Sequence, residues 1–327
     1  MTFKDYLGSS EAKSRLNESY KWWTDYIYHF SDIKNIAGIL NSGFLRSRNA
    51  VLQNPSLNYN DNASAEVIAG TAQDVHDHVR FYFRPLTPTQ YINEGIQNSR
   101  DVNEYNAHCP IPIFLLFDTS ILDNENTFFT YESLASHHDV AIFNNLEDFI
   151  DGPLHHIYHT GPLPVNERDL IKKRRHAEII IRDFCDLNHL KKIVCRTPAE
   201  RDYLLDMLLP DIKIKFENLI SVIEGNRITE MFFCRNLMIR EVNFYDSKLS
   251  IWFNKSEYTD RHIIVQLKHP GTNHIFAQWD SGECKPLTYL DSAHCLHLML
   301  TDGSLKINGT ELFIIIDGQI RYQKILI

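Results

Sequence analysis

A basic run followed directly by a glutamate is the part of the chain best suited to chemistry. Glu178 opens the β-branched segment 179–181, which predicts a buried strand. A carboxylate at the mouth of such a strand costs desolvation free energy unless a partner pairs with it. The cations before it are Lys172, Lys173, Arg174 and Arg175. They would draw a polyanion to the same place, so the pattern indicates either chemistry on a nucleic acid or a solvated basic turn before an edge strand.

The composition is that of a soluble globular protein. The 327 residues, 43% of them hydrophobic and 23% charged, are enough for two domains. No apolar run approaches the roughly 20 residues of a membrane span, and the start at Met1 lacks the layout of a signal peptide. The six cysteines are scattered without a C-x-x-C pair. We therefore expect a cytoplasmic protein with reduced thiols and no thiolate zinc site.

The net charge of −9 restricts how the chain can contact nucleic acid. A general nucleic-acid coat protein is usually basic overall. Contact here must therefore be local and transient, as an enzyme requires.

The first two thirds of the chain mix helical and strand patterns. Ser31 or Asp32 can cap a helix whose apolar residues keep helical spacing, and Gly43 ends it. Residues 49–75 predict a long loop that holds one short helix. The predicted strands are 26–30, 79–83, 111–117, 178–182 and 192–196, and further helices are predicted within 1–24, 91–97 and 145–160.

The pattern changes after about residue 217. Before it, Thr197 is the predicted N-cap of a helix, and Glu200 completes a capping box. After it come short apolar runs separated by turn residues, at 228–234, 236–244, 248–253, 261–267, 273–279, 295–300 and 311–316. This spacing is typical of an antiparallel sandwich or barrel. We predict an α+β domain over 1–216 and an all-β, sandwich-like domain over 217–327.

Three segments carry a family resemblance. Segment 28–36 reads Tyr-His-Phe-Ser-Asp-Ile-Lys-Asn-Ile, segment 76–88 reads His-Asp-His-Val-Arg-Phe-Tyr-Phe-Arg-Pro-Leu-Thr-Pro, and segment 174–180 reads Arg-Arg-His-Ala-Glu-Ile-Ile. In this order they resemble the DarT family of nucleic-acid ADP-ribosyltransferase toxins, over about residues 26–200. Each motif alone is weak, and three in the right order are a strong signal.

The resemblance implies a fold and a reaction. The fold is the ADP-ribosyltransferase fold, a split β-core that grips NAD+ as co-substrate, without a metal. Nicotinamide leaves, and a base on DNA attacks C1′ of the adjoining ribose. Cleavage builds an oxocarbenium-like cation that a fixed carboxylate stabilises, and Glu178 is that candidate. By analogy, Glu178 also accepts the proton of the attacking nitrogen.

The resemblance also implies an NAD+ site. It places His29 against a ribose, Tyr82 against the nicotinamide, and Ser31 and Asn35 nearby; Ser31 replaces a threonine and keeps the hydroxyl. The plainer interpretation of His29 is a satisfied core residue. Tyr82 faces away from both phenylalanine neighbours, so one side of its strand is core and the other is the cleft. The sequence leaves open which is which.

This chain departs from the family at an arginine. The family has one in the loop before the Phe-Tyr-Phe strand, where residues 49–79 contain none. Arg46 and Arg48 precede that gap, Arg80 stands where the family has proline, and Arg84 follows the strand. Any of them could hold the pyrophosphate. We assign Arg48 as the catalytic arginine and Arg46 to NAD+ binding, and regard the chain as a divergent member.

Segment 161–175 would be the substrate-reading loop of this fold. Its cations, suited to phosphate contacts, are Arg168, Lys172, Lys173, Arg174 and Arg175. Bases must be unstacked to react, so we expect a single strand rather than a duplex. The alternative is that these residues only keep the surface soluble.

The histidine clusters give little support to a metal site. His155 and His159 are four apart and would share a helix face, but no glutamate follows the first, as H-E-x-x-H requires. The other clusters are His137 with His138, and His294 with His297 around Cys295, which we interpret as strand residues. We expect no metal.

The leading hypothesis is an NAD+-dependent ADP-ribosyltransferase acting on single-stranded DNA, as the toxin of a toxin–antitoxin or phage-defence system with a cognate antitoxin. RNA is the close alternative as target, because the basic run cannot distinguish the two sugars. A non-catalytic nucleic-acid-binding module on a degenerate transferase fold belongs to a different class. A transferase acting on protein is disfavoured by the basic run. The β-rich part is expected to be accessory.

Overall fold

The structure is a computed structural model. It describes residues 1–14, 16–54, 65–71, 73–97, 108–136, 139–223, 225–245, 247–255, 260–282, 285–286, 290–299 and 309–326. None of the helices in these ranges is both long and apolar enough to pass through a bilayer.

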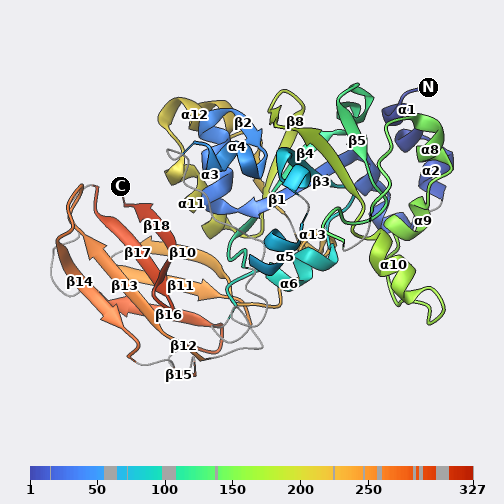
Figure 1. Cartoon of the computed structure of the whole chain (residues 1–327). Coiled ribbons are helices and arrows are strands. Elements are labelled where there is room, and N and C mark those ends of the chain that lie inside the picture. Colours follow the sequence, from blue (N-terminus) through green and yellow to red (C-terminus); the bar gives the residue numbers. More distant parts are fainter. Residues whose placement is uncertain are drawn as a thin grey trace.

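Helices and short strands alternate in the first part of the chain (Figure 1). Its helices are α1 (Phe3–Gly8), α2 (Ser10–Ser14), η1 (Glu18–Asp25), α3 (Ile33–Ser42), α4 (Arg48–Leu52), α5 (Ala65–Gly70), η2 (Gln73–Asp77), α6 (Pro88–Asn93), η3 (Thr119–Asp123), α8 (Leu146–Ile150), α9 (Leu154–Ile157), α10 (Arg168–Arg174), α11 (Pro198–Met207) and α12 (Pro210–Phe216). Its strands are β1 (Tyr26–Asp32), β2 (Phe44–Arg46), β3 (His78–Tyr82), β4 (Pro112–Asp118), β5 (Thr127–Phe129), β6 (Glu178–Arg182), β7 (Phe184–Asp186), β8 (Leu190–Cys195) and β9 (Ile220–Val222).

The central sheet has seven strands in the order β5-β6-β3-β1-β4-β8-β9. Neighbouring strands run antiparallel, except β8 and β9. β1 pairs with β4 along its whole length, whereas it meets β3 at a single register, Tyr28↔Tyr82. The sheet therefore opens between β1 and β3, as in the split β-core that the family resemblance implies.

The helix after β1 begins and ends where the sequence predicts. Of the two candidate caps, Asp32 is the N-cap, and its side chain accepts a hydrogen bond from the Lys34 amide at 3.1 Å. At the other end, Gly43 adopts φ 77°, a left-handed conformation that ends the helix. Between them, Ile36 and Leu40 are fully buried. This fixes α3 beside the opening of the sheet.

Only one of the two bonds in the capping box predicted for α11 is formed. Thr197 is the N-cap and accepts from the Glu200 amide at 3.1 Å, as predicted. The Glu200 carboxylate, however, accepts from the amide and guanidinium of Arg196. A buried arginine is a stronger partner for a carboxylate than a backbone N–H group. The second bond of a capping box, from the Thr197 amide to the Glu200 carboxylate, is therefore not made.

Four boundaries differ from the sequence expectation. Residues 228–234, predicted as a strand, begin with the helix α13 (Ile228–Met231). The helix predicted at 91–97 is α6, which begins earlier because Thr87 caps it. Gly152 and Pro153 divide the helix predicted at 145–160 into α8 and α9, and the predicted loop 161–175 contains α10. Short apolar or charged runs do not by themselves distinguish helix from strand or loop.

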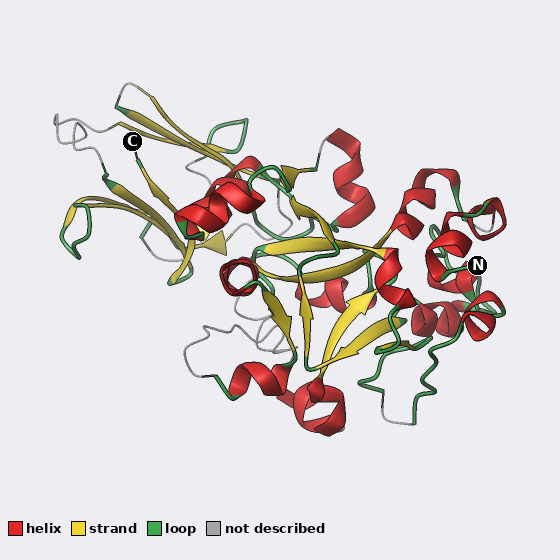
Figure 2. Cartoon of the chain, turned by 90° about the horizontal axis from the view of Figure 1, so that it is seen from above, coloured by secondary structure: helices red, strands yellow, loops and turns green. Residues whose placement is uncertain are grey.

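The last part of the chain is built almost entirely from strands, apart from η4 (Gly225–Arg227) and α13. They are β10 (Ile239–Tyr245), β11 (Lys248–Phe253), β12 (Asp260–Arg261), β13 (Ile263–Lys268), β14 (Ile275–Asp280), β15 (Lys285–Pro286), β16 (Cys295–Met299), β17 (Glu311–Ile316) and β18 (Gln319–Ile325). A three-stranded sheet, β10-β11-β16, and a four-stranded sheet, β14-β13-β17-β18, lie beside the central sheet (Figure 2), and most of their buried residues are on β11, β13 and β17. This confirms the extra β-rich part, whereas the boundary at 216/217 stays a prediction.

Replacing Gly43 by alanine is expected to lower the free energy of unfolding by about 1 kcal/mol. The φ of 77° is strained for any residue with a Cβ, and no heavy atom lies within 4 Å of an added Cβ, so strain alone acts. Gly8 is the matched control, since it has equal space and no positive φ; Gly8→Ala should leave stability unchanged or raise it by up to about 1 kcal/mol. Chemical denaturation measures both, and equal losses at the two positions would contradict this account.

Candidate active site

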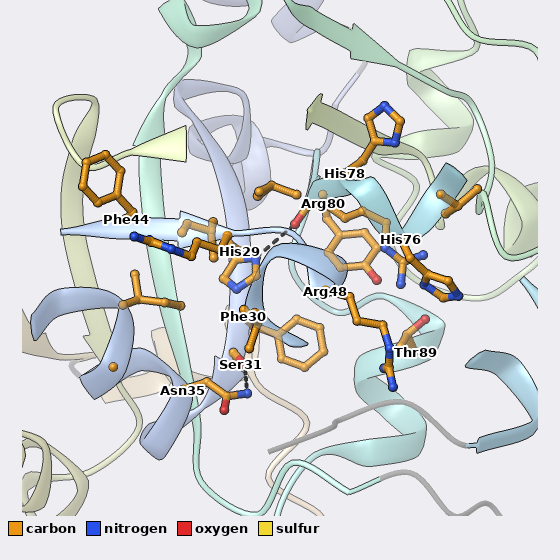
Figure 3. A pocket seen from close by; sticks show the side chains of 18 of the residues that line it. His29, Phe30, Ser31, Asn35, Phe44, Arg48, His76, His78, Arg80 and Thr89 are labelled. Carbon is orange, nitrogen blue, oxygen red and sulfur yellow. Dashed lines mark hydrogen bonds between the residues drawn. The ribbon is translucent and has the colours of Figure 1, made fainter. Parts of the chain in front are cut away.

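A cavity of about 220 Å³ lies where the central sheet opens. Residues of β1, α3 and β2 line one part of it, and residues of α4, α5, η2, β3 and α6 line most of the rest (Figure 3). Seven of the residues in its wall are candidates named from the sequence: His29, Ser31, Asn35, Arg46, Arg48, Arg80 and Tyr82. The structure thus brings together every predicted NAD+-binding residue.

His29 lies at the point where β1 and β3 separate. Its Nδ1 is 3.0 Å from the carbonyl oxygen of Arg80. A carbonyl oxygen can only accept, so Nδ1 must carry the proton. Burial lowers the pKa of His29 to about 4. The imidazole is therefore neutral at physiological pH, and Nε2 can accept a hydrogen bond from a hydroxyl group.

Ser31 and Asn35 form a polar pair beside His29. The Asn35 side-chain amide donates to Ser31 Oγ at 2.8 Å, and both residues are buried in the cavity wall. They are four residues apart, one at the end of β1 and one in the first turn of α3. The cap that starts α3 therefore also fixes this part of the wall.

The structure shows which side of the strand β3 faces the core and which side faces the cleft. Phe81 and Phe83 are fully buried in the core, whereas Tyr82 lines the cavity. Burial and the nearby charge of Glu178 raise the pKa of Tyr82 to about 12, so its phenol stays protonated. Tyr82 thus lies on the cleft side of the strand.

Glu178 is the first residue of β6 and pairs in register with Tyr82. It is only 1% exposed. The amide of Leu134 and the hydroxyl of Ser133 each donate to its carboxylate at 3.3 Å, and Arg80 Nη1 lies 3.7 Å away. Burial raises the pKa of Glu178, and the positive charge of Arg80 opposes this rise.

The four candidate arginines divide into two kinds. Arg46, Arg48 and Arg80 line the cavity. Arg84 does not, because its guanidinium stacks on Trp23 at 4.5 Å and donates to backbone carbonyls of Pro85, Ile157 and His159. Arg80, which was not among the assigned site residues, is the one that contacts Glu178. Strand alternation could have found it, since Arg80 and Tyr82 share one side of β3.

The predicted substrate-binding cations lie on or next to α10, and none of them lines the cavity. Arg168 and Lys172 are exposed. Lys173 and Arg174 lie 2.7 and 3.7 Å from the carboxylate of Glu132, and Arg175 contacts His159 Nδ1 at 3.0 Å. Three of the five predicted substrate-binding cations therefore already have protein partners.

The histidine clusters take different positions from those expected. α9 ends at Ile157, so His155 and His159 do not share a helix face. His294 precedes β16 with φ 58° and is not a strand residue, whereas His297 is. Asp291, Cys295 and His297 bring ligand-type atoms within 4.8 Å of one another on the β-rich part. His137 and His138 lie outside the described residues.

Replacing Glu178 by glutamine is expected to raise the melting temperature at pH 8. Because burial raises the pKa of Glu178, the unfolded chain ionises first as pH rises, and the folded state loses stability until its own carboxyl ionises. Glutamine keeps the shape without the charge, so the gain should shrink as pH falls towards about 4.

Glu132→Gln is the control, because it removes a carboxylate that pairs with Lys173 and Arg174 and should not raise the melting temperature. Thermal unfolding of both variants between pH 4 and pH 8 measures the difference. A lower melting temperature for Glu178→Gln than for the wild type at pH 8 would contradict the buried, destabilising charge.

Comparison with known proteins identifies the family. A family model described as ssDNA thymidine ADP-ribosyltransferase, DarT, matches residues 28–233. A search of curated proteins found no match. Similar solved structures include Thermus sp. 2.9 DarT in complex with ADP-ribosylated ssDNA, with 18% identity and TM-score 0.48 over 62% of this chain and 95% of that chain. The NAD+ complex of the same protein has 18% identity and TM-score 0.44, over 61% and 95%.

A third similar structure is Thermosipho africanus DarTG in complex with ADP-ribose, with 16% identity and TM-score 0.44 over 62% of this chain and 50% of that chain. The family model covers more than half of the chain and confirms the resemblance. This protein belongs to the DarT family and is an NAD+-dependent ADP-ribosyltransferase.

Proposed function

We propose that the protein transfers ADP-ribose from NAD+ to a base of single-stranded DNA, as the cytoplasmic toxin of a toxin–antitoxin or phage-defence pair. The family description, which names single-stranded DNA and thymidine, supports the target. The observation that carries the chemistry is the buried carboxylate of Glu178, held beside Arg80 and Tyr82 at the opening of the sheet. A cognate antitoxin protein is the proposed partner.

The proposed reaction breaks the bond between nicotinamide and ribose. The electron pair leaves with the nicotinamide, and C1′ becomes electron-poor. The Glu178 carboxylate stabilises this developing positive charge in a site where water is largely excluded. A ring nitrogen of the DNA base then bonds to C1′, and its proton passes to Glu178. Atoms and charges balance without a metal.

The cavity residues suit the parts of NAD+. His29, neutral through burial, accepts a hydrogen bond from a ribose hydroxyl at Nε2. The Tyr82 ring lies against the nicotinamide. Arg46 and Arg48 suit the pyrophosphate, because guanidinium groups bind phosphate oxygens in pairs. Ser31 and Asn35 complete the polar wall.

Arg80 has a second role in this proposal. At 3.7 Å from Glu178 it favours the ionised carboxylate against the cost of burial. It also places a positive charge beside Glu178 in a chain whose residues 49–79 contain no arginine. Arg80 therefore shares the catalytic assignment with Arg48.

RNA remains the alternative target. Nothing in the cations of α10 distinguishes ribose from deoxyribose, and the preference for DNA rests on the family description. A degenerate, non-catalytic module is disfavoured, because His29 and three arginines line one cavity, and Glu178 lies 3.7 Å from one of these arginines, Arg80.

The test of this function uses purified protein with labelled NAD+ and single-stranded DNA or RNA in separate reactions. We expect label on DNA, and a loss of about 10²–10³ in rate for Glu178→Gln. Label on RNA alone would show that RNA, and not DNA, is the target. No transfer to either polymer, with binding intact, would contradict the enzyme and leave a binding module.

Two neighbouring lysines test the nucleic-acid surface. Lys172 is exposed, whereas the Lys173 ammonium is held by Glu132 at 2.7 Å. Lys172→Ala should weaken single-stranded DNA binding and reduce the slope of log affinity against log salt by about 1. Lys173→Ala should change both less, since its charge is already paired. A fluorescence-anisotropy titration at several salt concentrations measures this, and equal effects would contradict the assignment.

A further inference from the structure

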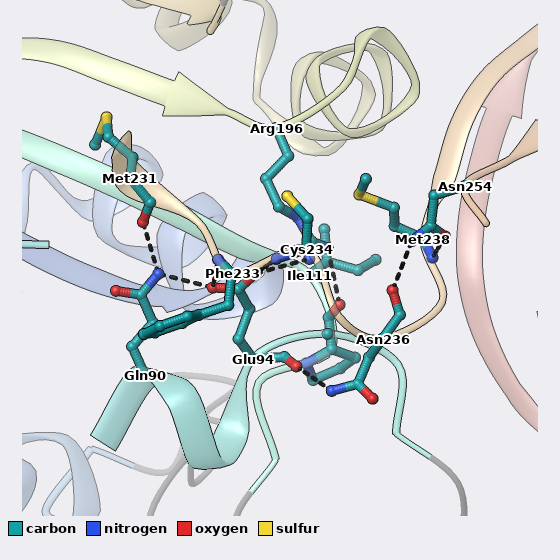
Figure 4. Close-up of polar contacts among 12 residues, drawn as sticks. Gln90, Glu94, Ile111, Arg196, Met231, Phe233, Cys234, Asn236, Met238 and Asn254 are labelled. Carbon is teal, nitrogen blue, oxygen red and sulfur yellow. Dashed lines mark hydrogen bonds and ion pairs between the residues drawn. The ribbon is translucent and has the colours of Figure 1, made fainter. Parts of the chain in front are cut away.

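The helix α6 lies between the cavity and the segment around residues 231–236. Thr89 and Asn93, four residues apart, line the cavity. Gln90, and Glu94 just past the end of the helix, form the adjacent row and are buried against the chain around residues 231–236 (Figure 4). One short helix therefore contacts both the cavity and the segment that leads into the β-rich part.

The carboxylate of Glu94 contacts four groups. It accepts hydrogen bonds from the amides of Phe233 and Cys234 at 3.1 and 2.9 Å and from the side chain of Gln90 at 2.7 Å. Arg196 Nη1 lies 3.7 Å away. Glu94 is only 3% exposed, so removal of its carboxylate would leave these buried donors unsatisfied. We call Gln90, Glu94 and Arg196 the clasp.

Gln90 is equally constrained. Its side chain accepts from the Leu86 amide at 2.8 Å and donates to the Met231 carbonyl at 2.7 Å. Burial opposes the charge of Arg196, but Glu200 and Glu94 outweigh burial and raise its pKa, so the guanidinium stays charged. The clasp is thus a buried polar network, whose hydrogen bonds hold Gln90 and Glu94 to the backbone of residues 231, 233 and 234.

The backbone beside the clasp is closely packed. Gly95 adopts φ 89°, and a Cβ at this position would lie 2.8 Å from Asn236 Cβ. The Asn236 side chain donates to the Glu94 carbonyl at 2.7 Å. The position of α6 is therefore set by residues 231–236, and little room is left for a shift.

On its other face, α6 reaches the proposed catalytic groups through Thr89. The Thr89 hydroxyl lies 3.3 Å from His176 Nδ1, and Thr89 is near enough to the Tyr82 phenol to oppose the rise in its pKa. His176 is two residues before Glu178. Thr89 thus links Tyr82 to the segment that opens β6.

We propose that the clasp positions α6, and through Thr89 sets the relative placement of Tyr82 and Glu178, so that Glu94 is a positioning residue for ADP-ribose transfer. The inference rests on the proposed roles of Tyr82 and Glu178. It makes the segment after α13 part of the catalytic apparatus rather than a detachable accessory. A displacement of about 1 Å at a reacting centre can cost about 10²-fold in rate, so a shift of α6 is enough to matter.

The test compares Glu94→Ala, Thr89→Ala and the double variant with Asp202→Ala. Asp202 forms an ion pair with Lys324, another contact between the first part of the chain and the β-rich part. Each variant is assayed for kcat and for KM of NAD+ well below its own melting temperature. Hydrogen exchange of segments 84–93 and 174–178 is measured in parallel.

We expect Glu94→Ala to lower kcat about 10-fold or more and to speed exchange in both segments. The double variant should be no slower than the worse single variant, because the two residues act along one path. Asp202→Ala should lower the melting temperature and leave kcat and exchange in these segments unchanged.

An unchanged kcat and unchanged exchange at 174–178 in Glu94→Ala would overturn the inference, as would multiplicative losses in the double variant. If the wild type transferred no ADP-ribose, the proposed function would fail, and hydrogen exchange would still decide whether Glu94 controls the segment before Glu178.

Discussion

The separation of β1 from β3 is the constraint on which the rest of the molecule depends. Two adjacent strands of one sheet pair at a single register, and beyond it each must satisfy its backbone groups elsewhere. His29 does this for β3, because its Nδ1–H group donates to the carbonyl of Arg80. The same bond fixes the tautomer of the imidazole and turns Nε2 into an acceptor. One side chain thus satisfies the backbone of β3 and, in the proposed function, binds a ribose hydroxyl.

The second constraint is electrostatic. A carboxylate that is 1% exposed is expensive to ionise, and Arg80, the Leu134 amide and the Ser133 hydroxyl together favour the ionised form. Full compensation would make Glu178 inert, because a well-paired carboxylate has little left to offer a developing cation. The raised pKa of Glu178 indicates that compensation is partial. In the proposed function, this uncompensated charge stabilises the developing cation, at the expense of fold stability.

Local patterns predicted much of the fold, and the residues that they assign to NAD+ binding line one cavity. The β-branched run after Glu178 identified β6 to the residue, and the cap and glycine identified α3. Long-range partners could not be found this way. The pairing of Lys173 and Arg174 with Glu132, and the contact of Arg80 with Glu178, join residues about 40 to 100 positions apart. The clasp could not be predicted from the sequence for the same reason, since Gln90 and Glu94 contact partners beyond residue 195.

The measurement that tests the account most directly is a crystal structure of Glu178→Gln with NAD+ bound. The account predicts NAD+ in the cavity between β1 and β3, with a ribose hydroxyl at His29 Nε2, the nicotinamide ring on Tyr82, and C1′ facing the side chain at position 178. NAD+ bound outside this opening, or bound with its nicotinamide remote from Tyr82 and position 178, would contradict it.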